Sequence, residues 1–259
     1  MIRTRRARGL LGCFAMVGPT SLKRGLLGAA LVISLVGCAW LALTIHPQPL
    51  FAFSLHRAGV VLHARTPLPP EAGPMLDEAM RRVSRSPLYD RRQTYDVFLT
   101  GSSSMYAFLT CGARGGGMTS VFGNVFIRPA NVATGRVFDR DGRAKTGERT
   151  LAYFVAHEVT HAVVQSRIGL YRHWQLAAFQ REGYADYVGF AHTVDFAAGR
   201  AAMRRNAPEM DTSRSGLYAR YELYVAYLLD RRGMSVDALL ARPLVARDVD
   251  RTLNADDSL

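Results

Sequence analysis

LAYFVAHEVTHAVVQSRI, residues 151–168, contains two histidines four residues apart, and a glutamate directly follows the first. Four residues make about one turn of α-helix, so a helix here stacks His157 and His161 on one face and turns Glu158 about 100° away. Two imidazoles one turn apart can bind one metal ion, with the carboxylate beside it. The flanking side chains are mostly apolar, so we expect this helix inside the domain.

A second acidic pair follows in REGYADYVGF, residues 181–190, after a helix end marked by Gly169. Glu182 and Asp186 are four residues apart, which places them one turn apart on a second predicted helix. The chain between His161 and Glu182 is long enough to end one helix and turn back. We therefore expect Glu182 as the third metal ligand, with Asp186 accepting the outer N–H of a ligand histidine.

The combination of HEVTH (157–161) and EGYAD (182–186) resembles the gluzincins, the thermolysin-like and aminopeptidase-like zinc metallopeptidases. The resemblance covers residues 149–190 and implies a Zn²⁺ cofactor. It assigns these roles: zinc ligands His157, His161 and Glu182, general base Glu158, and second-sphere partner Asp186. The related metzincin pattern requires Gly and His where this chain has Val164 and Arg167, so that class is excluded.

The resemblance implies hydrolysis of a peptide or protein substrate by a zinc-activated water, with Glu158 as general base. The alternative is a catalytically inactive, membrane-tethered zinc-binding module that acts through a protein partner. A structural zinc site needs no base and usually closes its fourth position with Cys or His. The presence of Glu158 therefore favours the peptidase over the inactive zinc-binding module.

The same resemblance suggests where substrate and transition state are held. It makes Val121–Arg128 the predicted edge strand for a substrate peptide, with Asn124 as a contact, although an ordinary sheet strand is equally compatible. Tyr221 and Tyr224, on a helix predicted from Ser215 to Arg232, are candidate donors to the transition state, with His173 next. Core tyrosines are the alternative for both. The Gly-rich segment 112–117 predicts a flexible loop over the cleft.

The N-terminal region predicts a membrane anchor. Residues 25–45 carry no charge and follow six basic residues; as a helix they span about 31 Å, the thickness of the hydrocarbon core. We expect 25–45 to be a transmembrane anchor in a bacterial inner membrane, with the basic segment 1–24 cytoplasmic and the remainder extracytoplasmic. A cleaved signal peptide and a lipoprotein acylated at Cys38 are the alternatives.

Composition is consistent with one sizeable domain after this anchor. The chain has 259 residues, 49% of them hydrophobic, and a net charge of +12. We expect an α+β fold for residues 47–259: a zincin-like metallopeptidase domain with a small mixed sheet packed on the active-site helix and a mainly helical C-terminal half. The positive charge suits a domain near anionic lipid or one that prefers acidic substrates. No nucleic-acid-binding motif is present.

Overall fold

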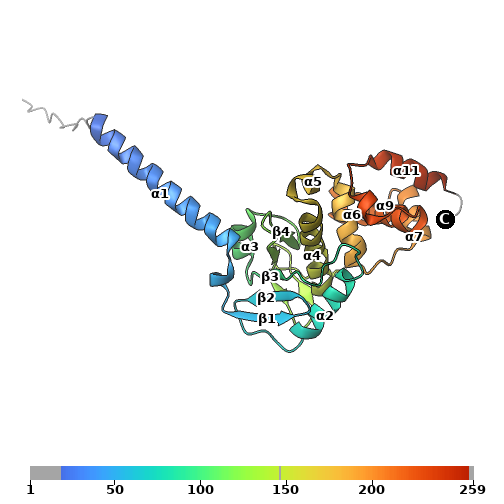
Figure 1. The fold of residues 1–259 in the computed structure, drawn as a ribbon, viewed down its shortest axis with the longest axis horizontal. Helices are drawn as coiled ribbons and strands as arrows, with labels where there is room; N and C mark the ends of the chain where they lie inside the picture. Colours follow the sequence, from blue (N-terminus) through green and yellow to red (C-terminus); the bar gives the residue numbers. More distant parts are fainter. Residues whose placement is uncertain (1–18, 146, 257–259) are drawn as a thin grey trace, which may run out of the picture. The chain divides into compact units, whose positions relative to one another are not determined.

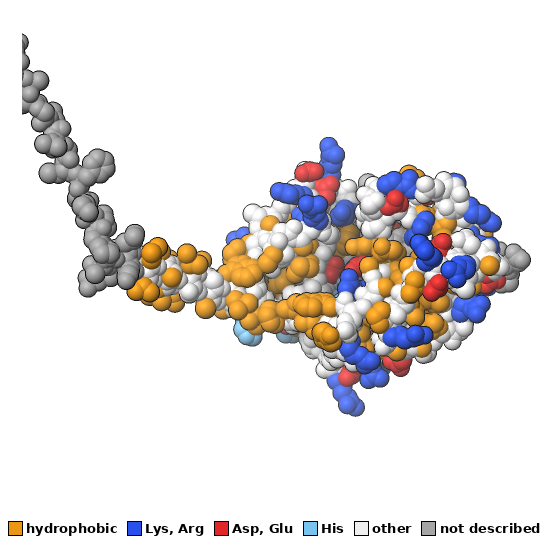
Figure 2. Space-filling model, turned by 90° about the horizontal axis from the view of Figure 1, so that it is seen from above, with side chains coloured by type: hydrophobic (Ala, Val, Ile, Leu, Met, Phe, Trp, Pro, Cys, Tyr) orange, Lys and Arg blue, Asp and Glu red, His pale blue; other side chains and the backbone are white. Residues whose placement is uncertain are grey.

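The computed structural model describes residues 19–145 and 147–256, and its contacts divide the chain into two units that meet between Leu43 and Thr44. Most of the predicted basic segment 1–24 lies outside the described residues. The first unit holds nearly all of helix α1, Pro19–Ile45. Its span Leu26–Ile45 has a mean hydropathy of 2.4. The visible surface of α1 is mostly hydrophobic (Figure 2), as in a membrane-spanning helix or a signal sequence.

The second unit is a mixed α+β domain, and its N-terminal half contains the sheet (Figure 1). The elements of this half are η1 (Gln48–Leu50), β1 (Phe53–Arg57), β2 (Val60–Ala64), α2 (Ala72–Val83), β3 (Tyr95–Leu99), α3 (Ser103–Thr110), β4 (Gly117–Thr119), β5 (Val125–Ile127), β6 (Ala130–Asn131) and β7 (Arg136–Val137). The five main strands lie in the order β1-β2-β3-β5-β4. β2, β3 and β5 are parallel, whereas β1 and β4 run antiparallel to their neighbours at the two edges.

The remaining elements are helical and follow the sheet in the chain. They are α4 (Leu151–Ile168), α5 (Leu170–Gln175), α6 (Ala178–Gly189), α7 (Phe196–Arg204), η2 (Pro208–Met210), α8 (Thr212–Ser215), α9 (Ala219–Ala226), η3 (Tyr227–Arg231), α10 (Val236–Leu239) and α11 (Ala246–Ala255). The expected combination of a small mixed sheet with a mainly helical C-terminal half is confirmed.

Alternating side chains give the sheet two apolar faces. Along β3 and β5, Val97 and Val125 point into the main core, which also contains the apolar side chains of α2 and α4. Phe98 and Phe126 point to the opposite face, where they form a second cluster with Tyr106 of α3. Period-two alternation of buried residues produces this arrangement of helices on both sides of one sheet. The helix α4 is thus held against the sheet along its length.

The structure corrects the prediction for the substrate strand. Within Val121–Arg128 only Val125–Ile127 forms a strand, and this strand β5 is paired on both sides, with β3 and with β4. An interior strand has no free backbone groups to offer a peptide. The edge strand next to β5 is β4, and it begins at Gly117, within the segment predicted to be a flexible loop.

Candidate metal centre

Helix α4 places the two histidines, and its ends agree with the sequence. The Thr150 hydroxyl accepts from the backbone N–H of Tyr153 at the N-terminus, and Gly169 ends the helix with a φ of +82°. The helix is buried through most of its length, and His157 and His161 are only 5% and 8% exposed. Two polar rings at that depth are costly unless they are paired or bound to a ligand.

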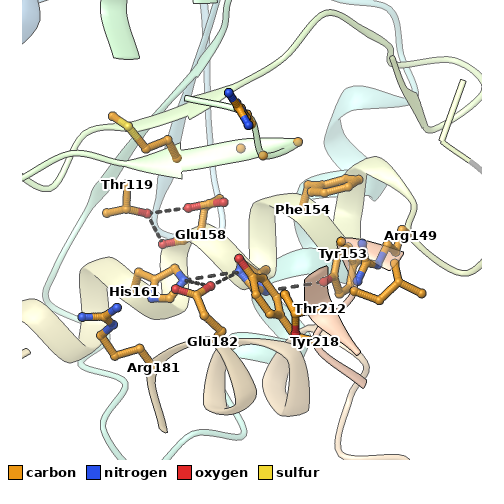
Figure 3. Close-up of a pocket in the computed structure, with 18 of the residues that line it drawn as sticks. Thr119, Arg149, Tyr153, Phe154, Glu158, His161, Arg181, Glu182, Thr212 and Tyr218 are labelled. Carbon is orange, nitrogen blue, oxygen red and sulfur yellow. Dashed lines mark hydrogen bonds and ion pairs between the residues drawn. The ribbon is translucent and has the colours of Figure 1, made fainter. Parts of the chain in front are cut away.

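Helix α6 brings Glu182 to these histidines. Its close packing on α9 depends on Gly183, because a Cβ there would lie 2.3 Å from the backbone oxygen of Tyr221. Glu182 Oε2 lies 3.6 Å from His157 Nε2 and 3.5 Å from His161 Nε2, and the two Nε2 atoms are 3.3 Å apart. Three potential ligand atoms from two helices thus form a small, nearly equilateral triangle (Figure 3).

The size of this triangle fits zinc. With zinc–ligand bonds of about 2.0–2.2 Å at tetrahedral angles, the ligand atoms lie roughly 3.3–3.6 Å apart. One face of an octahedral site with bonds of about 2.1–2.2 Å would bring them to roughly 3.0–3.1 Å. The observed separations match the tetrahedral case. Two imidazoles and one carboxylate are also the donor set of many catalytic zinc sites, which keep a fourth position open.

Asp186 fixes the orientation of the first histidine ring. Its Oδ1 lies 2.8 Å from His157 Nδ1 and also accepts a hydrogen bond from the Tyr153 hydroxyl. Burial disfavours the charged form of His157, but hydrogen bonds to Asp186 and Glu182 outweigh it and raise the pKa of His157 to about 10. With Nδ1–H donated to Asp186, Nε2 is the atom that faces Glu182, and a metal ion would bind there by displacing the Nε2 proton.

The two glutamates of the site have opposite electrostatic environments. Burial raises the pKa of the Glu158 carboxyl above its usual value. Burial also acts on Glu182, but the charge of His161 and the hydrogen bonds from both histidines hold the pKa of Glu182 well below its usual range. One carboxylate is therefore suited to accept and release a proton, and the other to stay ionised as a ligand.

Glu158 is positioned by the edge strand β4. The Thr119 hydroxyl lies 2.9 Å from Glu158 Oε2 and 2.7 Å from the Glu158 backbone oxygen, and its single proton can serve either acceptor. At Gly117 a Cβ would lie 2.6 Å from Glu158 Cγ. The absence of a side chain at Gly117 lets the strand approach the helix this closely.

These groups line an open cleft of about 640 Å³. One wall is the edge strand Gly117–Thr119 with the two glycines before it, and the histidines and Glu158 also line the cleft. Phe154, His173, Trp174, Leu217 and Tyr218 supply further wall surface. Figure 3 shows Thr119 and Glu158 facing each other across the gap between β4 and α4. The cleft is large enough to hold several residues of an extended peptide.

Three residues predicted to contact the substrate or the transition state, Asn124, Tyr221 and Tyr224, do not line this cleft. The Asn124 amide donates to the backbone oxygens of Thr44 and Ile45, at 3.1 and 2.9 Å. The Tyr224 hydroxyl donates to Asp250 at 2.7 Å. Tyr221 stacks against Tyr218 with ring centroids 5.8 Å apart. The polar groups of Asn124 and Tyr224 therefore have structural partners outside the site.

The structure places Tyr218 in the cleft instead. Its ring stacks on His157, with centroids 6.3 Å apart and an interplanar angle of 11°. The helix predicted from Ser215 is interrupted by Gly216, whose φ is +67°, and α9 starts only at Ala219. Tyr218 thus precedes the helix and faces the metal centre. Gly216 was the sequence signal for this break.

His173 lies in the cleft beside the second ligand histidine. Its ring centroid is 5.7 Å from that of His161, and neither ring nitrogen has a hydrogen-bond partner among the described residues. Burial lowers the pKa of His173 to about 4, so the ring is neutral at pH 7. It can therefore donate one hydrogen bond and accept another.

Comparison with protein-family models, with curated proteins and with solved structures gave no match for this chain.

Asp186→Asn should weaken zinc binding about 10- to 100-fold, because it removes the charge that orients His157 while keeping the shape of the side chain. The affinity is measured by competition with a chromogenic chelator, using the full-length protein in detergent. Asp250→Asn is the matched control, since Asp250 pairs with Tyr224 outside the cleft. Equal affinity for the Asp186 variant and the parent would show that the carboxylate does not support the site.

Proposed function

We propose that this protein is a zinc-dependent peptidase with a zincin-like catalytic domain of the gluzincin type. The observation that carries the proposal is the triangle of His157 Nε2, His161 Nε2 and Glu182 Oε2 beside the buried Glu158 carboxylate. A purely structural zinc site would have no use for a base or for an open cleft. Both accompany the metal-binding residues here.

The residues of the chain divide the work of hydrolysis between them. When bound, zinc supplies Lewis acidity, which acidifies water and polarises a substrate carbonyl. Glu158 accepts the proton of the attacking water and later delivers it to the leaving amine. Its raised pKa favours this exchange, because a base with too low a pKa holds the proton too weakly. Thr119 keeps the carboxylate in place during both transfers.

Strand β4 supplies the binding edge for an extended substrate. It pairs with β5 on one side only and lines the cleft with its other side. Free backbone N–H and C=O groups at a sheet edge can pair with a peptide as an added strand, independently of the peptide's sequence. A peptide held in this way lies directly over Glu158.

Tyr218 is the donor that we assign to the transition state. Burial, followed by the carboxylate charges of Glu182 and Asp186, raises the pKa of Tyr218, so its hydroxyl stays protonated at neutral pH. A hydrogen bond from a hydroxyl to the carbonyl oxygen is stronger in the transition state, where that oxygen carries more negative charge, than in the ground state. Neutral His173, on the other side of the centre, is available to hold the substrate.

We also propose that α1 remains attached and anchors the protein in a bacterial inner membrane, with the catalytic domain outside the cytoplasm. The long uncharged span and the basic residues before it support this topology. The apolar run continues to Ile45, beyond Cys38, where a lipidated protein would begin a polar tether.

Glu158→Gln should retain zinc and lose hydrolysis of a mixed peptide library by at least about 100-fold, because the amide cannot accept the proton.

Glu182→Ala should lose zinc, since only two ligands remain. Metal content is measured by elemental analysis and cleavage by mass spectrometry. Zinc binding by the parent without chelator-sensitive cleavage would support the inactive zinc-binding module instead, and full zinc occupancy in Glu182→Ala would reject the ligand set.

Tyr218→Phe should lower kcat about 100-fold and change KM little, because the lost hydroxyl acts mainly in the transition state. Tyr224→Phe is the matched control, since it removes a hydroxyl that binds Asp250 outside the cleft. Equal kcat values for the two variants would remove Tyr218 from the mechanism.

The anchor is tested by the mass of the native protein. Intact-protein mass spectrometry of the membrane fraction should find α1 present and Cys38 unmodified. A chain beginning after residue 45, or one beginning at an acylated Cys38, would replace the anchor with one of its alternatives.

A further inference from the structure

The walls of the cleft are strongly basic. Four cationic side chains line it, Arg114, Lys145, Arg149 and Arg181. Among the residues that the structure describes, the only carboxylates that line it are Glu158 and Glu182, which belong to the candidate metal centre itself. A bound divalent cation would raise the positive potential further. Charge of one sign in a concave site concentrates ligands of the opposite charge.

Among the described residues, no carboxylate oxygen lies within 4.0 Å of a side-chain nitrogen of any of these four cations. Elsewhere in the domain arginines are held by acids, as in the Arg57–Asp77 pair. Arg181 donates to the backbone oxygen of Trp174 at 3.2 Å, and the Arg149 guanidinium lies 5.7 Å from the ring centroid of Tyr153. Neither contact is an ion pair, although Arg149 also lines a neighbouring pocket with Glu148, Asp186 and Glu222.

Two of the cations, Lys145 and Arg149, lie close enough to repel each other. Burial, followed by the charge of Arg149, lowers the pKa of Lys145. This repulsion is the environment that an anionic ligand relieves, because a bound carboxylate interacts favourably with both cations.

Two of the cations lie at opposite ends of the metal centre. Arg149 immediately precedes Thr150, the N-cap of α4, and lies beside Tyr153 and Phe154. Arg181 precedes Glu182 on α6 and lies near His161 (Figure 3). A peptide extended along β4 over Glu158 would therefore meet one arginine on each side of the bond to be cut.

We propose that the cleft selects acidic peptides, with Asp or Glu side chains on both sides of the scissile bond, and that Arg149 and Arg181 determine this preference separately on the two sides. The proposal rests on the peptidase function above. The acidic side chains would bind the guanidinium groups through charge-assisted hydrogen bonds.

The first test measures binding without turnover. The full-length Glu158→Gln variant in detergent is titrated with fluorescent peptides of equal length, one rich in Glu and one with Gln at the same positions. The Glu-rich peptide should bind more tightly, by roughly two- to fivefold for each charge that is engaged, and the advantage should shrink as salt is raised. Equal affinity for the two peptides, or an advantage unchanged by salt, would overturn the proposal.

The second test assigns the sides. The parent and the variants Arg149→Gln and Arg181→Gln each digest a mixed peptide library, and the residues flanking every cleavage are counted. Each variant should lose acidic preference on one side only, and the two should lose it on opposite sides. Arg91→Gln is the charge-matched control, because Arg91 is exposed and does not line the cleft.

The outcomes separate the two proposals. Absence of any chelator-sensitive cleavage by the parent contradicts the peptidase function. Cleavage without acidic preference, or a preference reduced equally by Arg91→Gln, leaves the peptidase intact and rejects the role of the cleft arginines.

Discussion

Two buried imidazoles and a partly buried carboxylate meet at one cleft, and the rest of the domain is arranged so that they can do so. The histidines come from α4, which is buried against the sheet, and Glu182 comes from α6, which is held in place by close packing on α9. Groups of this kind at such depth are stable only when each finds a partner. Asp186 pairs with His157 at Nδ1. A metal ion would bind His157 at its other ring nitrogen, together with His161 and Glu182.

In the proposed peptidase, the edge strand connects this centre to the substrate. β4 closes one side of the cleft and holds the Glu158 carboxylate through Thr119. Among the described residues it pairs with no strand other than β5. In the proposed peptidase, the same short segment therefore contacts both the base and the bound peptide.

The sequence predicted the parts of the fold that depend on local pattern. The helix at Leu151–Ile168 has the expected bounds, and Glu182 and Asp186 lie where helical spacing placed them. The edge strand was predicted wrongly, because sheet order depends on pairing between distant segments and a three-residue strand that starts at a glycine shows no periodicity. Tyr218 was overlooked because one continuous helix was predicted from Ser215 to Arg232, which Gly216 interrupts.

The glycines at 116 and 117 carry a consequence for protein engineering. A Cβ at Gly116 would lie 2.3 Å from the ring of Phe154, and one at Gly117 would lie 2.6 Å from Glu158 Cγ. These two positions contribute no chemical group, yet they set the gap between strand and helix. If only the histidines and glutamates were transplanted into another scaffold, the three candidate ligands could still bind a metal ion. Glu158 would then lie at the wrong distance from that ion. The smallest transferable unit therefore includes two residues with no side chain at all.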